Sequence, residues 1–178
     1  MLLDMAIMDP QSLLRETWKQ LIKAYTLGGA ILKTEKNMEN AMMQICEKLI
    51  AEDSLAFKLK RQEEHRGRIV DLVIQSPDER VFIQLKLYHD KADWKESPSM
   101  KNTVESDLKF AKGYGDTFVA LIDTIPSTTR TSLPFKLKWR EIEINKKTFF
   151  VEYSTIHPKT SPPRERHQRV LLAKGTEI

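Results

Sequence analysis

Two apolar runs separated by a short polar turn limit the folds open to this chain more than anything else in its sequence. Residues 69–74 (IVDLVI) and 81–88 (VFIQLKLY) each have the length and composition of a buried β-strand. Between them, Pro77-Asp78 suits the centre of a tight turn. The two runs are therefore predicted to pair as antiparallel strands inside a larger sheet.

Three polar side chains interrupt this apolar hairpin. A turn centred on Pro77-Asp78 places Asp71 directly opposite Gln84 on one face, with Lys86 one step further along. Side chains paired in this way have Cβ atoms about 4.5–5.5 Å apart. Because an acid in an apolar strand costs free energy unless something pairs with it, either Lys86 or a bound cation is expected beside Asp71.

The remaining pattern predicts helices and strands around this hairpin. Asp9-Pro10 is a helix start and Gly28-Gly29 a helix stop. From these signals and from periodicity we expect the following elements in chain order: a helix over 10–27, a helix over 38–51 capped by Asn37, a strand over 55–60, a polar connection over 61–68, the hairpin, a helix over 101–112, a strand over 117–122, and a second hairpin of 136–144 with 147–155.

Composition excludes several classes of protein. The 178 residues include 40% hydrophobic and 30% charged side chains, which suits one globular domain and excludes a wholly disordered chain. Cys46 is the single cysteine, so neither an intramolecular disulfide nor a multi-cysteine zinc cluster can form. No apolar run reaches the roughly 18–20 residues that span a bilayer. We therefore expect a cytoplasmic protein with no membrane partner.

The positive charge is concentrated towards the end of the sequence. Lys and Arg number 29 against 25 Asp and Glu, but residues 124–178 hold 11 basic and 5 acidic side chains. A basic strip of this kind can face nucleic-acid phosphates, and it can equally be a solvated surface. Lys138 and Arg140 of this strip are expected to contact nucleic acid on the first interpretation. Four basic residues outside the strip are expected to do the same: Lys58, Lys60, Arg66 and Arg68.

The run RIVDLVIQSPDERVFIQLKLY resembles the signature of the PD-(D/E)XK nuclease superfamily, the restriction-endonuclease-like fold. Asp71 matches the first acid of that signature, and Gln84-Leu85-Lys86 matches its second element in the glutamine form found in Mrr-like enzymes. Val70 stands where the signature has proline, and Gln84 where a carboxylate is more usual. The predicted order αβββαβ over about 37–122 is also that of the family core.

This resemblance implies a specific chemistry. Mg²⁺, for which Mn²⁺ can substitute, would be bound by Asp71, the Gln84 side-chain oxygen and the Leu85 carbonyl. Lys86 would orient or deprotonate the attacking water and stabilise the phosphate in the transition state. A glutamic acid from the first core helix joins many such sites. Here Glu39 is the first candidate and Glu47 the second, while an acid favoured by the helix N-terminus is an equal explanation of Glu39.

The fold expected from the sequence is therefore α/β, with a three-layer restriction-endonuclease-like core. Its central mixed sheet is flanked by helices, with an additional N-terminal helix and a C-terminal β-hairpin. The expected divisions are an N-terminal helix and linker (1–36), the nuclease domain (37–155) and a basic, proline-containing tail (156–178).

The expected function is Mg²⁺-dependent cleavage of DNA by an endonuclease of a restriction, defence, mobile-element or repair type. Double-stranded DNA and a second copy of the chain are the expected partners, because one site per chain requires two chains to cut both strands. Two alternatives stay open. One is a nucleic-acid-binding or assembly protein that keeps the fold without cutting, which Gln84 favours, and the other is a protein-interaction module.

Overall fold

The structure is a computed structural model that describes residues 8–65, 67–88, 106–108, 116–124, 138–144, 147–159 and 168–175. Two helices precede a seven-stranded sheet of order β1-β2-β3-β4-β7-β6-β5. The elements are α1 (Pro10–Thr26), α2 (Glu35–Glu52), β1 (Lys58–His65), β2 (Arg68–Gln75), β3 (Arg80–Tyr88), β4 (Asp116–Thr124), β5 (Lys138–Ile144), β6 (Lys147–Ile156) and β7 (Gln168–Gly175). Strands β3 and β4 are parallel, and every other neighbouring pair is antiparallel. The expected α/β class with a mixed sheet is confirmed.

The helix termini follow from capping side chains. Asp9 accepts a hydrogen bond from the Ser12 N–H at 2.7 Å, as predicted, and α1 ends just before Gly28, whose φ is +82°. The predicted cap of α2 is wrong. Thr34 is the N-cap, and its hydroxyl accepts the Asn37 N–H at 3.1 Å. Asn37, the third helical residue, accepts the Thr34 N–H with its side-chain oxygen.

Strand β1 corrects another prediction. It runs to His65, through residues expected to form a polar connection, and does not include residues 55–57. Because β1 is at the edge of the sheet, one side of it has no strand partner, and charged side chains are tolerated there. The second hairpin is confirmed, since Lys138 pairs with Tyr153 and Ile144 with Lys147. Of the helix expected over 101–112, the described residues 106–108 are helical and the others lie outside the described residues.

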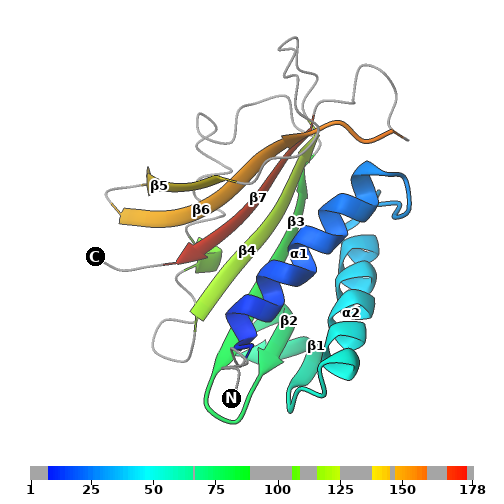
Figure 1. The fold of residues 1–178 in the computed structure, drawn as a ribbon. Helices are drawn as coiled ribbons and strands as arrows, with labels where there is room; N and C mark the ends of the chain where they lie inside the picture. The colour runs from blue at the N-terminus through cyan, green and yellow to red at the C-terminus, as the bar shows by residue number, and fades with distance from the viewer. Residues whose placement is uncertain are drawn as a thin grey trace, which may run out of the picture.

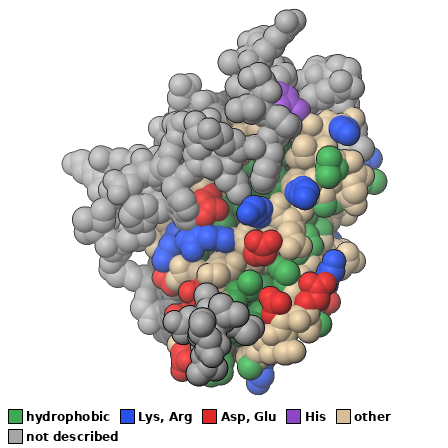
Figure 2. Space-filling view, viewed as in Figure 1, with side chains coloured by type: hydrophobic (Ala, Val, Ile, Leu, Met, Phe, Trp, Pro, Cys, Tyr) green, Lys and Arg blue, Asp and Glu red, His purple; other side chains and the backbone are tan. Residues whose placement is uncertain are grey.

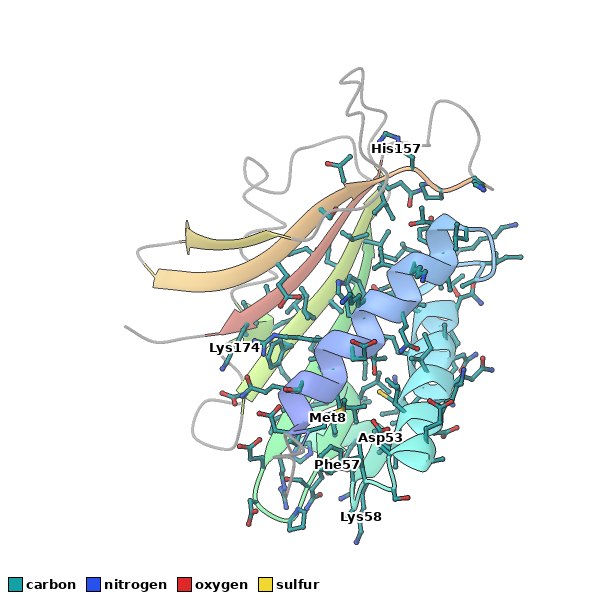
Figure 3. All side chains as sticks on the ribbon, in the orientation of Figure 1. Met8, Asp53, Phe57, Lys58, His157 and Lys174 are labelled. Carbon is teal, nitrogen blue, oxygen red and sulfur yellow. The ribbon has the colours of Figure 1, made fainter. Side chains whose placement is uncertain are left out.

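Helices α1 and α2 lie side by side across one face of the sheet and form the main core with it (Figure 1). Trp18, Leu21 and Met42 are completely buried between the helices and the strands. The strands contribute alternate residues to this core, among them Leu72, Ile74, Val81, Ile83, Phe118 and Leu172. Lys174, at the end of β7, donates a hydrogen bond to Gln11 of α1 at 3.0 Å and fastens the helix to the sheet (Figure 3).

The opposite face of the sheet carries a second, smaller cluster of Val70, Val73 and Phe82. Residues 106–108 lie on this face, because Asp107 reaches Lys86 of β3 and Leu108 packs against Gly175 of β7. Both faces of the sheet are therefore covered. Two long helices lie on one face and, among the described residues, this short helical segment lies on the other.

The segment expected to be a tail contains a strand of the sheet. Strand β7 lies between β4 and β6, and its Val170 and Leu172 are fully buried in the main core. Their apolar side chains supply the burial that offsets the entropy of ordering this segment. The expected boundary at residue 156 therefore does not separate these residues from the sheet, and α1, expected in a separate N-terminal part, belongs to the same core.

Substitution of Gly175 tests the packing of the second face. A Cβ at this position would lie 2.9 Å from the Leu108 carbonyl oxygen, so the main chain of one segment would have to move. We expect Gly175→Ala to lower the free energy of unfolding by about 1–3 kcal/mol. Gly29→Ala is the matched control, since its Cβ would meet nothing closer than 3.5 Å, and a change within about 0.5 kcal/mol is expected. Denaturant unfolding measures both, and equal effects would contradict this packing.

Candidate active site at the break between β2 and β3

The hairpin has the register that its turn predicts. Leu72 pairs with Ile83 and Gln75 with Arg80, in the register that sets Asp71 against Gln84. The Ser76 hydroxyl holds the turn by accepting the N–H groups of Asp78 at 3.3 Å and Glu79 at 3.0 Å. The regular pairing ends at Leu72 and Ile83, so Asp71 and Gln84 lie immediately beyond the last paired residues.

The Asp71 carboxylate occupies this break in the sheet. Its Oδ2 accepts the main-chain N–H of Leu85 at 2.7 Å, in place of a carbonyl from the neighbouring strand. The Gln84 side chain also bonds to β2, donating to the Ile69 carbonyl at 3.2 Å. The acid and the amide predicted to face each other therefore both lie at the end of the regular pairing, and each bonds to the backbone of the opposite strand.

Strands β1 and β2 both change face at the row of residues that crosses the sheet through Gln62, Asp71 and Gln84. Side chains two apart normally share a face, yet Leu72 packs with the helices while Val70 packs with Val73 and Phe82 on the other side. In β1, the residue opposite Asp71 in the register is Gln62, which has φ +49° and is skipped by the regular pairing. A left-handed backbone at a residue other than glycine costs free energy and is common at functional sites.

Glu39 reaches this row from α2. Its carboxylate is 4% exposed and accepts bonds from Arg61 at 2.7 Å, Lys36 at 3.2 Å and the Gln62 amide at 2.9 Å. The same Gln62 nitrogen lies 3.2 Å from Asp71 Oδ1, so one amide joins the two carboxylates. Burial by itself raises the pKa of Glu39, but these bonds and the Arg61 charge outweigh it and lower the pKa. Glu47, the second candidate, is exposed.

Lys86 does not pair with Asp71. Its ammonium nitrogen lies 3.5 Å from Asp107 Oδ2, and Arg68 lies 3.6 Å from the other oxygen of the same carboxylate. Among the described residues, no cationic side chain lies within ion-pair distance of Asp71. Burial raises the pKa of Asp107 more than the charges of Lys86 and Arg68 lower it, and the Asp71 charge raises it further. Asp71, Lys86 and Asp107 therefore share one electrostatic environment.

Gln62 and Asp107 are not among the site residues expected from the sequence. Gln62 lies in a segment expected to be a connection, where no strand pairing could be assigned to it. Asp107 follows the inward position Val104 by one helical turn in the expected helix, and that spacing was a usable signal for an inward-facing acid. The fold brings both residues to the row through contacts that join distant parts of the chain.

The described residues form a candidate site that has several oxygen ligands but few carboxylates. No group of three or more His, Cys, Asp or Glu side chains placed to hold a metal ion is present in the described ranges. The potential ligands are the carboxylates of Asp71 and Glu39, the Gln84 amide oxygen and the Leu85 carbonyl. The two main-chain groups of a strand residue point to the same neighbouring strand, so the Leu85 carbonyl faces the Asp71 side of β3.

The basic residues expected to contact nucleic acid are distributed across the sheet. Lys58 and Lys60 lie on β1 and the backbone of Lys138 and Arg140 on β5, at opposite edges of the sheet. Six strand spacings of about 4.8 Å separate these edges by roughly 29 Å. Arg68 is drawn to Asp107 and Ser106, and Arg66 lies outside the described residues. The helix-covered face carries both charge signs intermixed (Figure 2).

Comparisons of this chain with protein-family models, with curated proteins and with solved structures find no match. Neither α1 nor α2 is apolar enough over a sufficient length to cross a membrane.

Loss of the Gln62 amide should destabilise the protein. Gln62→Leu leaves Glu39 and Asp71 without their shared donor, at an expected cost of about 1–3 kcal/mol in the free energy of unfolding. Gln44→Leu makes the same change at an exposed position of α2 and is the control. Chemical denaturation of both variants provides the measurement, and a Gln62→Leu protein as stable as the control would show that the bridge contributes nothing.

Glu39 should make stability depend on acid pH. Its pKa is lowered in the folded protein, so its contribution is complete above its usual pKa of 4.5 and is lost as pH falls through the folded value. We expect wild type to lose stability below about pH 4.5 more steeply than Glu39→Gln. Thermal unfolding from pH 7 to pH 3 measures this, with Glu47→Gln as the exposed control. Parallel curves for wild type and Glu39→Gln would contradict the assignment.

Proposed function

We propose that this chain is a metal-dependent endonuclease of the restriction-endonuclease-like fold that hydrolyses phosphodiester bonds in DNA. The order α2-β1-β2-β3, then helical residues 106–108, then β4 is consistent with the αβββαβ core that the sequence signature implies. The observation that carries the proposal is the Asp71 carboxylate. It lies in a break between two strands, next to Gln84 and Leu85, with no cationic partner among the described residues.

The chemistry of the donors suits a hard divalent cation. Mg²⁺ prefers oxygen ligands and keeps several waters, and Mn²⁺ accepts the same set. Asp71, the Gln84 amide oxygen and the Leu85 carbonyl would hold the ion, with Glu39 contributing from α2. When bound, the ion would lower the pKa of a coordinated water and neutralise charge on the scissile phosphate. With glutamine in place of one acid, we expect weak binding or a single ion.

Lys86 supplies the positive charge of the proposed site. It lies on β3 two residues beyond Gln84, and its side chain is 25% exposed, so its ammonium is partly shielded but accessible. From there it can orient the attacking water and stabilise charge that develops on the phosphate oxygens. Because Lys86 pairs with Asp107 and not with Asp71, no ion pair with Lys86 competes with a cation for the Asp71 carboxylate.

The partners follow from the reaction. Cutting both strands of double-stranded DNA with one site per chain requires two copies, so we propose a homodimer that acts in the cytoplasm. Restriction, defence, mobile-element and repair roles all use this chemistry. Because the basic residues on β1 and β5 lie at opposite edges of the sheet, we propose that DNA contacts one edge per chain, with Lys58, Lys60 and Arg68 as contacts on the side of β1 and β2.

Cleavage of supercoiled plasmid tests the proposal. Wild type should nick or linearise DNA with Mg²⁺ or Mn²⁺ and not with EDTA. Asp71→Asn and Lys86→Ala should each lower the rate by about 100-fold or more, while DNA binding is retained. Lys48→Ala, an exposed helix position, is the control for lysine removal. Metal-dependent cutting that persists in both site variants would exclude this site.

A second function is favoured by the state of Glu39. Its two oxygens are already bonded to Arg61, Lys36 and Gln62. Of the two carboxylates at the site, only Asp71 is then left to bind a metal ion. A protein that keeps this fold and binds nucleic acid without cutting it would have such an arrangement. In the same experiment it would show salt-sensitive DNA binding and no metal-dependent cleavage. Absence of both signals would leave the protein-interaction alternative.

A further inference from the structure

Lys86 has to be held in place to serve the proposed reaction. A lysine side chain has four rotatable carbon–carbon bonds, and it acts as a flexible point charge unless a neighbour fixes it. The nearest anionic group among the described residues is the Asp107 carboxylate, with Oδ2 at 3.5 Å from the lysine nitrogen. Asp107 belongs to the helical segment 106–108 on the second face of the sheet, far from Lys86 in sequence.

The segment that carries Asp107 is itself anchored. Arg68 of β2 donates to the Ser106 hydroxyl at 2.8 Å and to the Ser106 carbonyl at 3.3 Å. Leu108 packs against Gly175 of β7, where the two backbones are too close for a Cβ. Contacts on both sides thus fix Asp107, a residue that is 8% exposed. Its carboxylate lies between Arg68 and Lys86.

A purely structural role explains this carboxylate poorly. Its Oδ2 is buried and has no hydrogen-bond partner among the described residues, and both of its ion pairs are longer than 3.4 Å. A buried acid with loose partners costs stability. The contrast within the same molecule is Glu152, which is equally buried but is held by a hydrogen-bonded ion pair to Arg15 at 3.0 Å.

We propose that Asp107 is a positioning residue that fixes the Lys86 ammonium, apart from Asp71, for the attack on a phosphodiester backbone. The inference rests on the proposed function for the reaction and on the observed contacts for the positioning. Asp107 draws the lysine ammonium away from direct pairing with Asp71, which leaves the acid to bind a cation and the amine to face the phosphate. Among the residues that the structure describes, the charged groups around Asp107 are Lys86 of β3, Arg68 of β2 and Asp71.

Asp107→Asn tests the proposal, because it keeps the side-chain volume and removes the charge. We expect kcat for plasmid cleavage to fall by roughly 10- to 100-fold with little change in KM, since a loosened catalytic group affects the chemical step. Asp107→Glu should restore part of the lost rate. Glu152→Gln removes a matched buried acid on the opposite face and should cleave like wild type if it is folded by circular dichroism.

Acetylation of lysines by a limiting reagent, read by mass spectrometry, gives a measurement that needs no activity. In Asp107→Asn, Lys86 should be acetylated faster than in wild type, relative to the exposed Lys48 in the same sample. An unchanged rate of Lys86 acetylation relative to Lys48 overturns the proposal. A loss of kcat in Glu152→Gln as large as that in Asp107→Asn also overturns it. If wild type does not cut DNA, the proposed function fails, and the acetylation result alone decides whether Asp107 holds Lys86.

Discussion

A single hydrogen bond, from the Leu85 N–H to the Asp71 carboxylate, determines how this sheet can be arranged around the candidate site. Inside a regular sheet, that N–H would donate to a carbonyl of the neighbouring strand. Here a side chain takes the place of the carbonyl, and regular pairing of β2 with β3 ends at Leu72. The break gives a carboxylate a satisfied position within an otherwise apolar pair of strands, which removes most of the cost of placing it there.

The charges around this break are divided between the two faces of the sheet. On the helix side, Glu39 is neutralised by Arg61 and Lys36. On the other side, Lys86 and Arg68 are drawn to Asp107. Asp71 lies between the two groups and is joined to the first through the Gln62 amide. The change of face at Gln62 and Asp71 is what allows side chains from both sides to meet at one row.

The sequence predicts the hairpin because its determinants are local. Turn residues and alternation set the register, and the register places Asp71 across from Gln84, whereas Lys86 turns to Asp107. Gln62 could not be predicted in the same way, since its left-handed backbone breaks the period on which strand assignment depends. Asp107 and β7 reach their places through long-range packing, which no window of the sequence contains. The sequence offers both Glu39 and Glu47 as candidates, and only tertiary packing shows that Glu39 is buried against Arg61 while Glu47 is exposed.

The separation of Lys86 from Asp71 is the step that a structural explanation accounts for least. If stability were the only requirement, a direct pair between these two residues would neutralise both charges without a third. The fold instead brings in Asp107, whose burial raises its pKa and whose Oδ2 has no hydrogen bond among the described residues. With Arg68, four ionisable groups then share one partly buried region, and this costs more free energy than a single pair. The extra cost is understandable if Asp71 must stay unpaired for a cation while Lys86 is held for a phosphate, which is the arrangement that the proposed hydrolysis of a phosphodiester would use.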